Sequence, residues 1–260
     1  AYMDAWIKHR CEKEILSMLR VLADLLDVKM TAHCEPFSQE GGYRVVWPIA
    51  GESSRSISVV LNILMQVLTR PTLSVGGQPL VDRTNTDEED MQKEISLLKR
   101  SLKLKQAGAL IPRELVELLA SWPKFCKYKS NFYEALRGYP KVTKINVREL
   151  NDKNRARSGS LEVKREQFDY FILRSDDLPT IKDNKATIEI ISPVLKDSRY
   201  RWKGIYNKGG ETIDFYMCDE DFKKQMFDEK ISFTSGMCID CVLEIARKLS
   251  ELGETVNISY

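Results

Sequence analysis

The chain contains only two histidines, His9 and His33, among its 260 residues. Histidine is the commonest general base, so a Ser–His or Cys–His nucleophile has few candidate partners here. The glycine motifs that bind phosphate are also missing, because no G-x-G-x-x-G run and no G-K-[ST] step follows Gly41-Gly42. No motif indicates a cofactor, so none is expected. The sequence thus favours a protein that is not an enzyme with a self-contained active site.

Long apolar runs and an excess of one charge are absent as well. A membrane-spanning helix needs about 18 consecutive apolar residues, and the longest run, 57–68, is interrupted by Ser58, Asn62 and Gln66. The 40 basic and 38 acidic side chains leave a formal charge of +2. These features predict no integral membrane segment, and they favour neither a strongly basic nor a strongly acidic partner.

The six cysteines are scattered, and only Cys238 and Cys241 lie close together in the sequence. The residues around them are rich in Ile, Val and Leu and predict a strand. Positions i and i+3 of a strand point to opposite faces, so the two thiols should diverge. A zinc site would need a second pair of ligands, which the sequence lacks nearby. We therefore expect structural thiols in a reducing cytoplasm, and no metal site.

Hydrophobic periodicity is what the sequence does supply. Up to about Pro140, apolar residues recur mainly at helical spacing, with two short strands, 27–32 and 43–49, near the start. Thr86 with Glu89 forms a capping-box signature. The predicted helices are 5–26, 57–68, 86–107, 113–120 and 131–137.

After Pro140 the period changes from 3.6 to 2, which is typical of strands. The fold class predicted is α+β, with a helix-rich domain, 1–140, before a small and mostly antiparallel β-rich domain, 141–260. The segment 176–179 is a second candidate boundary. The predicted strands are 142–147, 161–163, 168–173, 187–191, 200–206, 212–218, 231–233, 237–246 and 255–260, with one helix at 220–228.

A basic interval, 124–157, carries ten basic residues and three acidic ones in a nearly neutral chain. Aromatic residues are interleaved with these charges, as in surfaces that follow a phosphate backbone and stack bases. The alternative is a solvated basic face whose aromatic residues belong to the core. The candidate nucleic-acid-binding residues are Lys124, Lys127, Lys129, Arg137, Lys141, Lys144, Arg148, Lys153, Arg155 and Arg157.

The order of elements from 86 to 165 resembles a winged helix, with 131–137 as recognition helix and 151–160 as wing. A second alternative is a metal-dependent nuclease, because Asp152 followed by Glu162-Val163-Lys164 matches the D…ExK layout of such enzymes. That pattern is short and arises by chance in charged chains.

The apolar helix 57–68 has two interpretations. Its stripe of Ile57, Leu61, Leu64 and Leu68 could face the core or a protein partner. The second interpretation predicts association with protein partners or with further copies of the chain.

Three segments carry a resemblance to known proteins. They are KSNFYEALRGYPKVTKINV, ATIEIISPVLKDSRYRWKGIYN and ISFTSGMCIDCVLEI, within residues 129–260. This part of the chain resembles a family of uncharacterised bacterial proteins associated with mobile-element and phage-defence neighbourhoods. The resemblance implies an intracellular bacterial setting and favours a defence or sensing role, and it assigns no catalytic residues. The leading hypothesis is a non-enzymatic defence component that senses or assembles with protein partners, with a nucleic-acid-binding module as the alternative.

Overall fold

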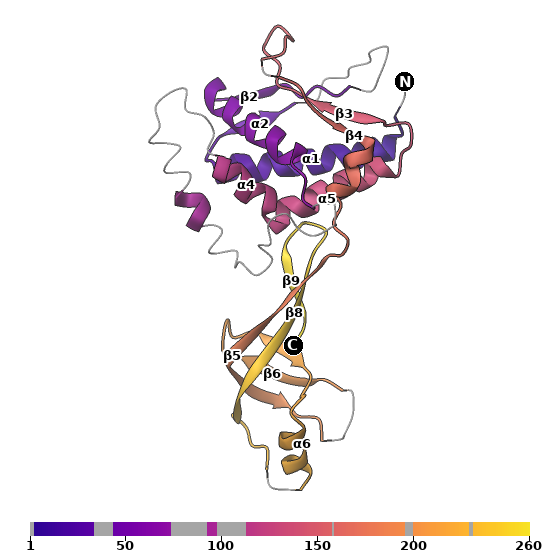
Figure 1. Ribbon diagram of the computed structural model, residues 1–260. Helices are drawn as coiled ribbons and strands as arrows, with labels where there is room; N and C mark the ends of the chain where they lie inside the picture. The colour runs from indigo at the N-terminus through magenta and orange to yellow at the C-terminus, as the bar shows by residue number, and fades with distance from the viewer. Residues whose placement is uncertain are drawn as a thin grey trace. The chain divides into compact units, whose positions relative to one another are not determined.

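The computed structural model describes residues 3–33, 44–73, 93–97, 113–157, 159–195, 200–228 and 231–260. The chain forms two compact units (Figure 1). Unit 1 comprises Ala1–Asp176 and Glu251–Glu254, and unit 2 comprises Asp177–Ser250 and Thr255–Tyr260. Helices lie mainly in the N-terminal half, and a five-stranded antiparallel sheet forms the C-terminal part, which confirms the α+β fold class.

Helices build most of unit 1. The labelled ones are α1 (Ala5–Leu25), α2 (Ser54–Thr69), α4 (Arg113–Ser121) and α5 (Pro123–Arg137), and residues 93–97 are helical as well. Two side chains start the first two helices by accepting backbone N–H bonds: Asp4 from Trp6 and Ile7, and Ser53 from Ser56. The predictions of helices at 5–26, 57–68 and 113–120 are confirmed. Most of the predicted helix 86–107 lies outside the described residues.

Helix α5 is longer and more buried than the sequence suggested. The prediction began this helix at Asn131 with Ser130 as its cap, but the helix begins at Pro123. Proline has no N–H to lose and a fixed φ that suits the first helical position, so it starts a helix as readily as it ends one. The Ser130 hydroxyl instead accepts a hydrogen bond from the Leu173 N–H, 2.9 Å away. Ten of the fifteen residues of α5 are buried.

Two small antiparallel hairpins accompany the helices. Strands β1 (Met30–Ala32) and β2 (Ile49–Gly51) form one, and β3 (Lys144–Val147) and β4 (Leu161–Lys164) form the other. Two strand predictions are corrected. In place of the strand expected at 43–49, the structure has β2, which begins at Ile49, the last residue of the predicted range. Residues 168–173 do not form a strand, because the 3-10 helix η1 (Arg165–Tyr170) places Phe168 and Phe171 into the core of unit 1.

Unit 2 is built on one long strand. Strand β5 (Asp177–Ser192) pairs with β6 (Trp202–Tyr206) through its C-terminal part and with β8 (Cys238–Leu249) along most of its length. Register shifts interrupt the pairing of β5, and such bulges bend a strand and increase its twist, which curves the sheet. Strands β7 (Thr212–Phe215) and β9 (Thr255–Ser259) form the edges, giving the order β7-β6-β5-β8-β9.

The two edge strands meet at one point. The backbone N–H of Tyr216, just after β7, donates to the carbonyl oxygen of Tyr260, just after β9, at 3.0 Å. The sheet is thereby drawn toward a partly open barrel. Helix α6 (Glu220–Phe227) connects the third strand of this unit to the fourth. This strand order and helix position match the topology of the OB-fold, a five-stranded Greek-key barrel. A fold of this kind does not by itself specify a function.

Aromatic residues fill the core of unit 2. The Trp202 ring lies within 5.5–6.3 Å of the rings of Phe215, Phe222 and Phe233. Phe222 comes from α6, whose N-cap residue Asp219 accepts the Phe222 N–H with its side chain. Residues 231–233, predicted as a strand, adopt no regular structure.

Polar contacts stabilise one bulge of β5. The Asp183 carboxylate accepts hydrogen bonds from the Tyr206 hydroxyl at 2.5 Å and the Lys185 N–H at 3.1 Å, and it pairs with Lys208 at 2.9 Å. The bond from Tyr206, followed by that from Lys208, lowers the pKa of Asp183 to about 2.

The division between the units falls after Asp176. Strands β3 and β4, which follow Pro140, belong to unit 1, because they cover its helical core. The division therefore lies at the segment 176–179, and residues 177–179 are already part of β5 rather than a linker.

Gly204 in the centre of β6 allows the sheet to pack. A Cβ atom at this position would lie 2.4 Å from Ile188 Cγ2 and 2.8 Å from the Glu189 carbonyl oxygen. We therefore predict that Gly204→Ala destabilises unit 2 by about 1–3 kcal/mol, as overpacking does in cores. Urea unfolding can be followed by the fluorescence of Trp202, the only tryptophan of unit 2. Gly159→Ala is the matched control, since nothing lies within 4 Å of a Cβ there. Equal unfolding midpoints for the two variants would contradict the prediction.

Candidate functional site

Lys129 of the basic interval lies in the core of unit 1 and is fully buried. Its ammonium donates to the carbonyl oxygens of Arg70, at 3.2 Å, and Ala120, at 3.0 Å. These carbonyls lie at the C-terminal ends of α2 and α4, where the helix dipole favours a cation. Burial lowers the pKa of Lys129 to about 8. The prediction that Lys129 contacts nucleic acid is therefore corrected, because its side chain does not reach solvent.

Lys127 and Lys124 contact acidic residues of unit 1. Lys127 is also buried, and its ammonium pairs with Asp176 at 2.7 Å and with Glu251 at 3.9 Å. Lys124 pairs with Glu254 at 3.8 Å. Both glutamates lie in the turn between β8 and β9, which belongs to unit 1. These two lysines attach that turn to α5, and this corrects their assignment to an open binding surface.

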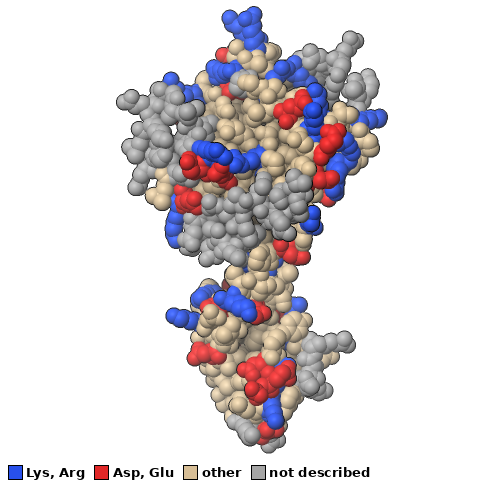
Figure 2. Space-filling model, in the orientation of Figure 1, with Lys and Arg blue, Asp and Glu red and all other residues tan. Residues whose placement is uncertain are grey.

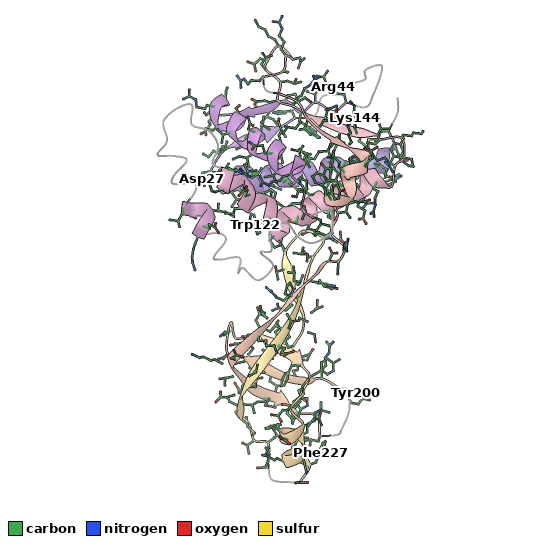
Figure 3. The ribbon with its side chains drawn as sticks, viewed as in Figure 1. Asp27, Arg44, Trp122, Lys144, Tyr200 and Phe227 are labelled. Atoms are coloured by element: carbon green, nitrogen blue, oxygen red, sulfur yellow. The ribbon has the colours of Figure 1, made fainter. Side chains whose placement is uncertain are left out.

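Four further basic residues of the interval contact an acidic or an aromatic side chain. Arg137 pairs with Asp169 at 3.0 Å, and Lys144 pairs with Glu162 at 2.9 Å. Arg157 pairs with Glu149 at 3.3 Å, and the ammonium of Lys141 lies 5.9 Å from the centre of the Tyr139 ring. Figure 3 labels Lys144 on β3. Surface pairs of this kind contribute little to stability, but each reduces the charge presented to a ligand.

Arg148, Lys153 and Arg155 remain. All three are exposed and have no ion-pair partner within the described part of the chain. They lie in the turn between β3 and β4, which we call the basic turn (148–157). This turn is the part of the predicted wing that the structure retains.

The other half of the winged-helix prediction does not hold. The predicted recognition helix is part of α5, whose Phe132 and Tyr133 are buried against α1 and η1. The Tyr133 ring stacks on Phe171 with centroids 4.1 Å apart, and its hydroxyl donates to the Leu68 carbonyl at 3.0 Å. Phe125 and Tyr128 are buried too, so these aromatic residues belong to the core. A helix buried in this way cannot enter a groove of DNA.

The nuclease pattern does not form a metal site. Glu162 forms its ion pair with Lys144, which lowers the pKa of the Glu162 carboxyl, and Asp152 lies in the exposed basic turn. Among the residues described, no three His, Cys, Asp or Glu side chains cluster as metal ligands. Cys238 and Cys241 point to opposite faces of β8, as predicted: Cys238 is exposed, whereas Cys241 is half-buried.

The apolar stripe of α2 belongs to the core. Ile57, Leu64 and Leu68 are buried in unit 1, and Leu61 packs against the same cluster. The structure therefore corrects the idea of a partner-facing helix at 57–68, because these side chains are covered by α1, α4 and β4.

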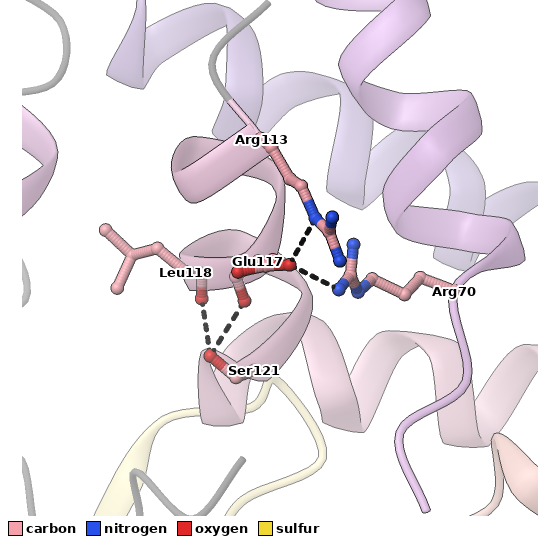
Figure 4. A network of polar contacts seen from close by, with 5 residues as sticks. All are labelled: Arg70, Arg113, Glu117, Leu118 and Ser121. Atoms are coloured by element: carbon pink, nitrogen blue, oxygen red, sulfur yellow. Dashed lines mark hydrogen bonds and ion pairs between the residues drawn. The ribbon is translucent and has the colours of Figure 1, made fainter. Parts of the chain in front are cut away.

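An ion-pair network joins α2 to α4 (Figure 4). The Glu117 carboxylate accepts hydrogen bonds from Arg70 at 2.7 Å and from Arg113 at 2.8 Å. The bonds from Arg113 and Arg70 lower the pKa of Glu117. The Ser121 hydroxyl donates to the Glu117 and Leu118 carbonyl oxygens in the last turn of α4. The two guanidinium groups share one carboxylate, so this network stabilises the helix pair.

Unit 2 exposes more large apolar side chains than unit 1. Eight of the eleven exposed ones among the described residues belong to it, although it holds the smaller part of these residues. They are Ile191, Leu195, Tyr200, Tyr216, Phe227, Val242, Val256 and Ile258. Sequence analysis missed this surface. Alternating apolar residues in a strand look the same whether they face the core or the solvent.

Two clusters make up part of this surface. Val256 and Ile258 lie on the edge strand β9 and are 41 % and 43 % exposed, whereas Val242 lies on β8, six residues before Lys248, the residue paired with Val256. At the ends of β6 and β7, the Arg201 guanidinium lies 5.2 Å from the centre of the Tyr216 ring. The neighbouring Tyr200 is 68 % exposed and projects outward in Figure 3.

No helix in the described ranges is long and apolar enough to cross a membrane. Compared with models of protein families, with curated proteins and with solved structures, the chain shows no match in any of the three.

The burial of Lys129 makes stability depend on pH in a specific direction. The folded protein releases this proton near pH 8, whereas the unfolded chain holds it up to 10.5, so the folded state gains stability as the pH rises between these values. Lys129→Met keeps the apolar stem and cannot titrate. We predict that wild type gains up to about 3 kcal/mol relative to Lys129→Met between about pH 7 and pH 10. Urea unfolding of both proteins checks this, and parallel pH curves would contradict it.

Proposed function

We propose that the chain is a non-enzymatic component of a protein assembly, in which copies of the chain bind one another through the apolar side chains exposed on unit 2. The observation that carries this proposal is the concentration of these side chains in the smaller unit. Single exposed apolar residues are common on monomeric proteins, but neighbouring ones on adjacent strands mark contact surfaces. Burying them would release about 25 cal/mol for each Å² removed from water.

Charge supports a protein partner for unit 2 over a nucleic acid. Its residues include 12 Lys and Arg and 13 Asp and Glu. Salt bridges across the sheet pair some of them, as between Lys182 and Glu244. A phosphate backbone needs a surplus of positive charge, which this unit does not carry.

Strand β9 supports a second copy as the partner. It is an edge strand, and its outer edge has one backbone hydrogen bond within the described structure, at Tyr260. Unpaired N–H and C=O groups on an edge favour pairing with another strand. Two copies of β9 paired antiparallel about Asn257 would place Val256 opposite Ile258 of the other copy. A contact of this type is self-complementary, as two-fold dimers require.

Five residues of strand pairing bury too little area for a stable dimer, which needs about 1,200 Å² or more. The remaining exposed side chains of unit 2 would have to contribute, and among them is Tyr216, whose backbone N–H is bonded to the Tyr260 carbonyl at the end of β9. The resemblance of residues 129–260 to a family of uncharacterised bacterial proteins, associated with mobile-element and phage-defence neighbourhoods, favours a defence or sensing setting for such an assembly.

Light scattering coupled to size exclusion tests the proposal. At about 10 µM, where a micromolar interface is occupied, we predict a mass at least twice the 30.0 kDa of one chain. The double variant Val256→Asp/Ile258→Asp should elute as a monomer, because the dimer would bury unpaired charges. Both positions are exposed, so folding should be unchanged.

Asn207→Asp, in the exposed turn after β6, is the control and should retain the wild-type mass. A monomeric wild type at this concentration would refute the proposal. So would a double variant that keeps the mass of the assembly.

A further inference from the structure

The basic turn between β3 and β4 is ordered by its own hydrogen bonds. The Asn151 side-chain oxygen accepts the backbone N–H groups of Lys153 and Arg155, each at 3.0 Å. The Asn151 N–H donates to the Arg155 carbonyl at 2.8 Å, and Asn154 adopts a positive φ of 56° that closes the turn. Lys153 and Arg155 are therefore presented from a backbone that is fixed in advance.

The base of the turn is attached to the core of unit 1. Glu149 is buried, and its carboxylate accepts hydrogen bonds from the Ser58 hydroxyl at 3.0 Å and from Arg157 at 3.3 Å. Ser58 lies on α2, so the turn is held by a buried polar contact with a core helix. The ion pair with Glu149 also neutralises the charge of Arg157. Arg157 is therefore not counted with the three unpaired basic residues.

Positive charge gathers at the tip. The turn protrudes at the top of unit 1 in Figure 1, and Figure 2 shows blue Lys and Arg atoms covering its end. Arg148, Lys153 and Arg155 face one exposed acid within the turn, Asp152. A preorganised donor set of this kind loses little side-chain and backbone entropy when it binds.

We infer that the basic turn binds phosphate groups of a double-stranded nucleic acid, through Arg148, Lys153 and Arg155. Arginine matches phosphate oxygens with two parallel N–H donors, and lysine adds a point charge. A two-stranded β-ribbon fits the width of the major groove, which places its basic tip between the backbones. The site lies wholly within unit 1 and is independent of the proposed assembly.

The composition of the turn excludes two other ligands. Residues 148–157 contain no aromatic side chain, so the turn offers no platform on which bases of a single strand could stack. The only apolar residues there are Leu150 and Ala156, which face each other in a β-bridge. A membrane surface attracts clusters of about four to eight basic residues, which is more than the three unpaired ones here.

Fluorescence anisotropy with a 20-base-pair duplex is the test, measured between about 50 and 200 mM NaCl. For three phosphate contacts, log affinity should fall against log salt with a slope of about −2.7. The triple variant Arg148→Gln/Lys153→Gln/Arg155→Gln should bind about tenfold or more weakly at 100 mM NaCl, with a slope that is smaller in magnitude by about 2.7. All three side chains are exposed, and circular dichroism would verify that the variant folds.

The variant Arg10→Gln/Lys13→Gln/Arg20→Gln is the matched control, since it removes the same charge from exposed positions of α1. It should leave duplex affinity within about twofold of wild type. If both triple variants weakened duplex binding equally, the loss would be explained by net charge alone, and the inference would be overturned. Absence of duplex binding by wild type at 50 mM NaCl would overturn it too. The inference would also be overturned if the wild-type protein bound a single strand more tightly than the duplex. It would equally be overturned if the basic turn were needed only for binding to phosphatidylserine vesicles.

Discussion

The helical core of unit 1 is built around the buried side chain of Lys129, where α2, α4 and α5 meet. The group has lost its water, and the carbonyls of Arg70 and Ala120 take its place. A buried cation is tolerated only where acceptors surround it, so the ends of two helices must lie where α5 can reach them. The need for these two carbonyl acceptors restricts how the three helices can be arranged, and it restricts the conformations of the side chains packed nearby.

Ion pairs within unit 1 account for much of the charge of the basic interval. Lys124 and Lys127 hold the β8–β9 turn, and Arg157 neutralises the buried Glu149. A cluster of basic residues in the sequence thus becomes a set of internal contacts, and only the basic turn keeps a surplus of charge. Most of the acidic partners, among them Asp176, Glu251 and Glu254, come from outside the interval, which is why it looked nearly unopposed in the sequence.

Unit 2 follows a different constraint, which is the double pairing of β5. The register shifts in β5 bend the strand and increase its twist, and the contacts of Asp183 with Tyr206 and Lys208 lie beside one of them. The curved sheet encloses an aromatic core around Trp202 and leaves β9 at an edge. The same curvature that closes the core therefore exposes Val256 and Ile258.

The sequence by itself determined the fold class, the helices α1, α2 and α4, and most strands of unit 2, because hydrophobic period is a local property of the chain. It also determined that Cys238 and Cys241 diverge, since strand geometry fixes that. Only the tertiary structure decided which lysines are buried, where α5 begins, and which apolar strand residues face solvent. Burial and charge pairing depend on residues far apart in the sequence, such as Lys127 and Glu251, and no local pattern records which of them will meet.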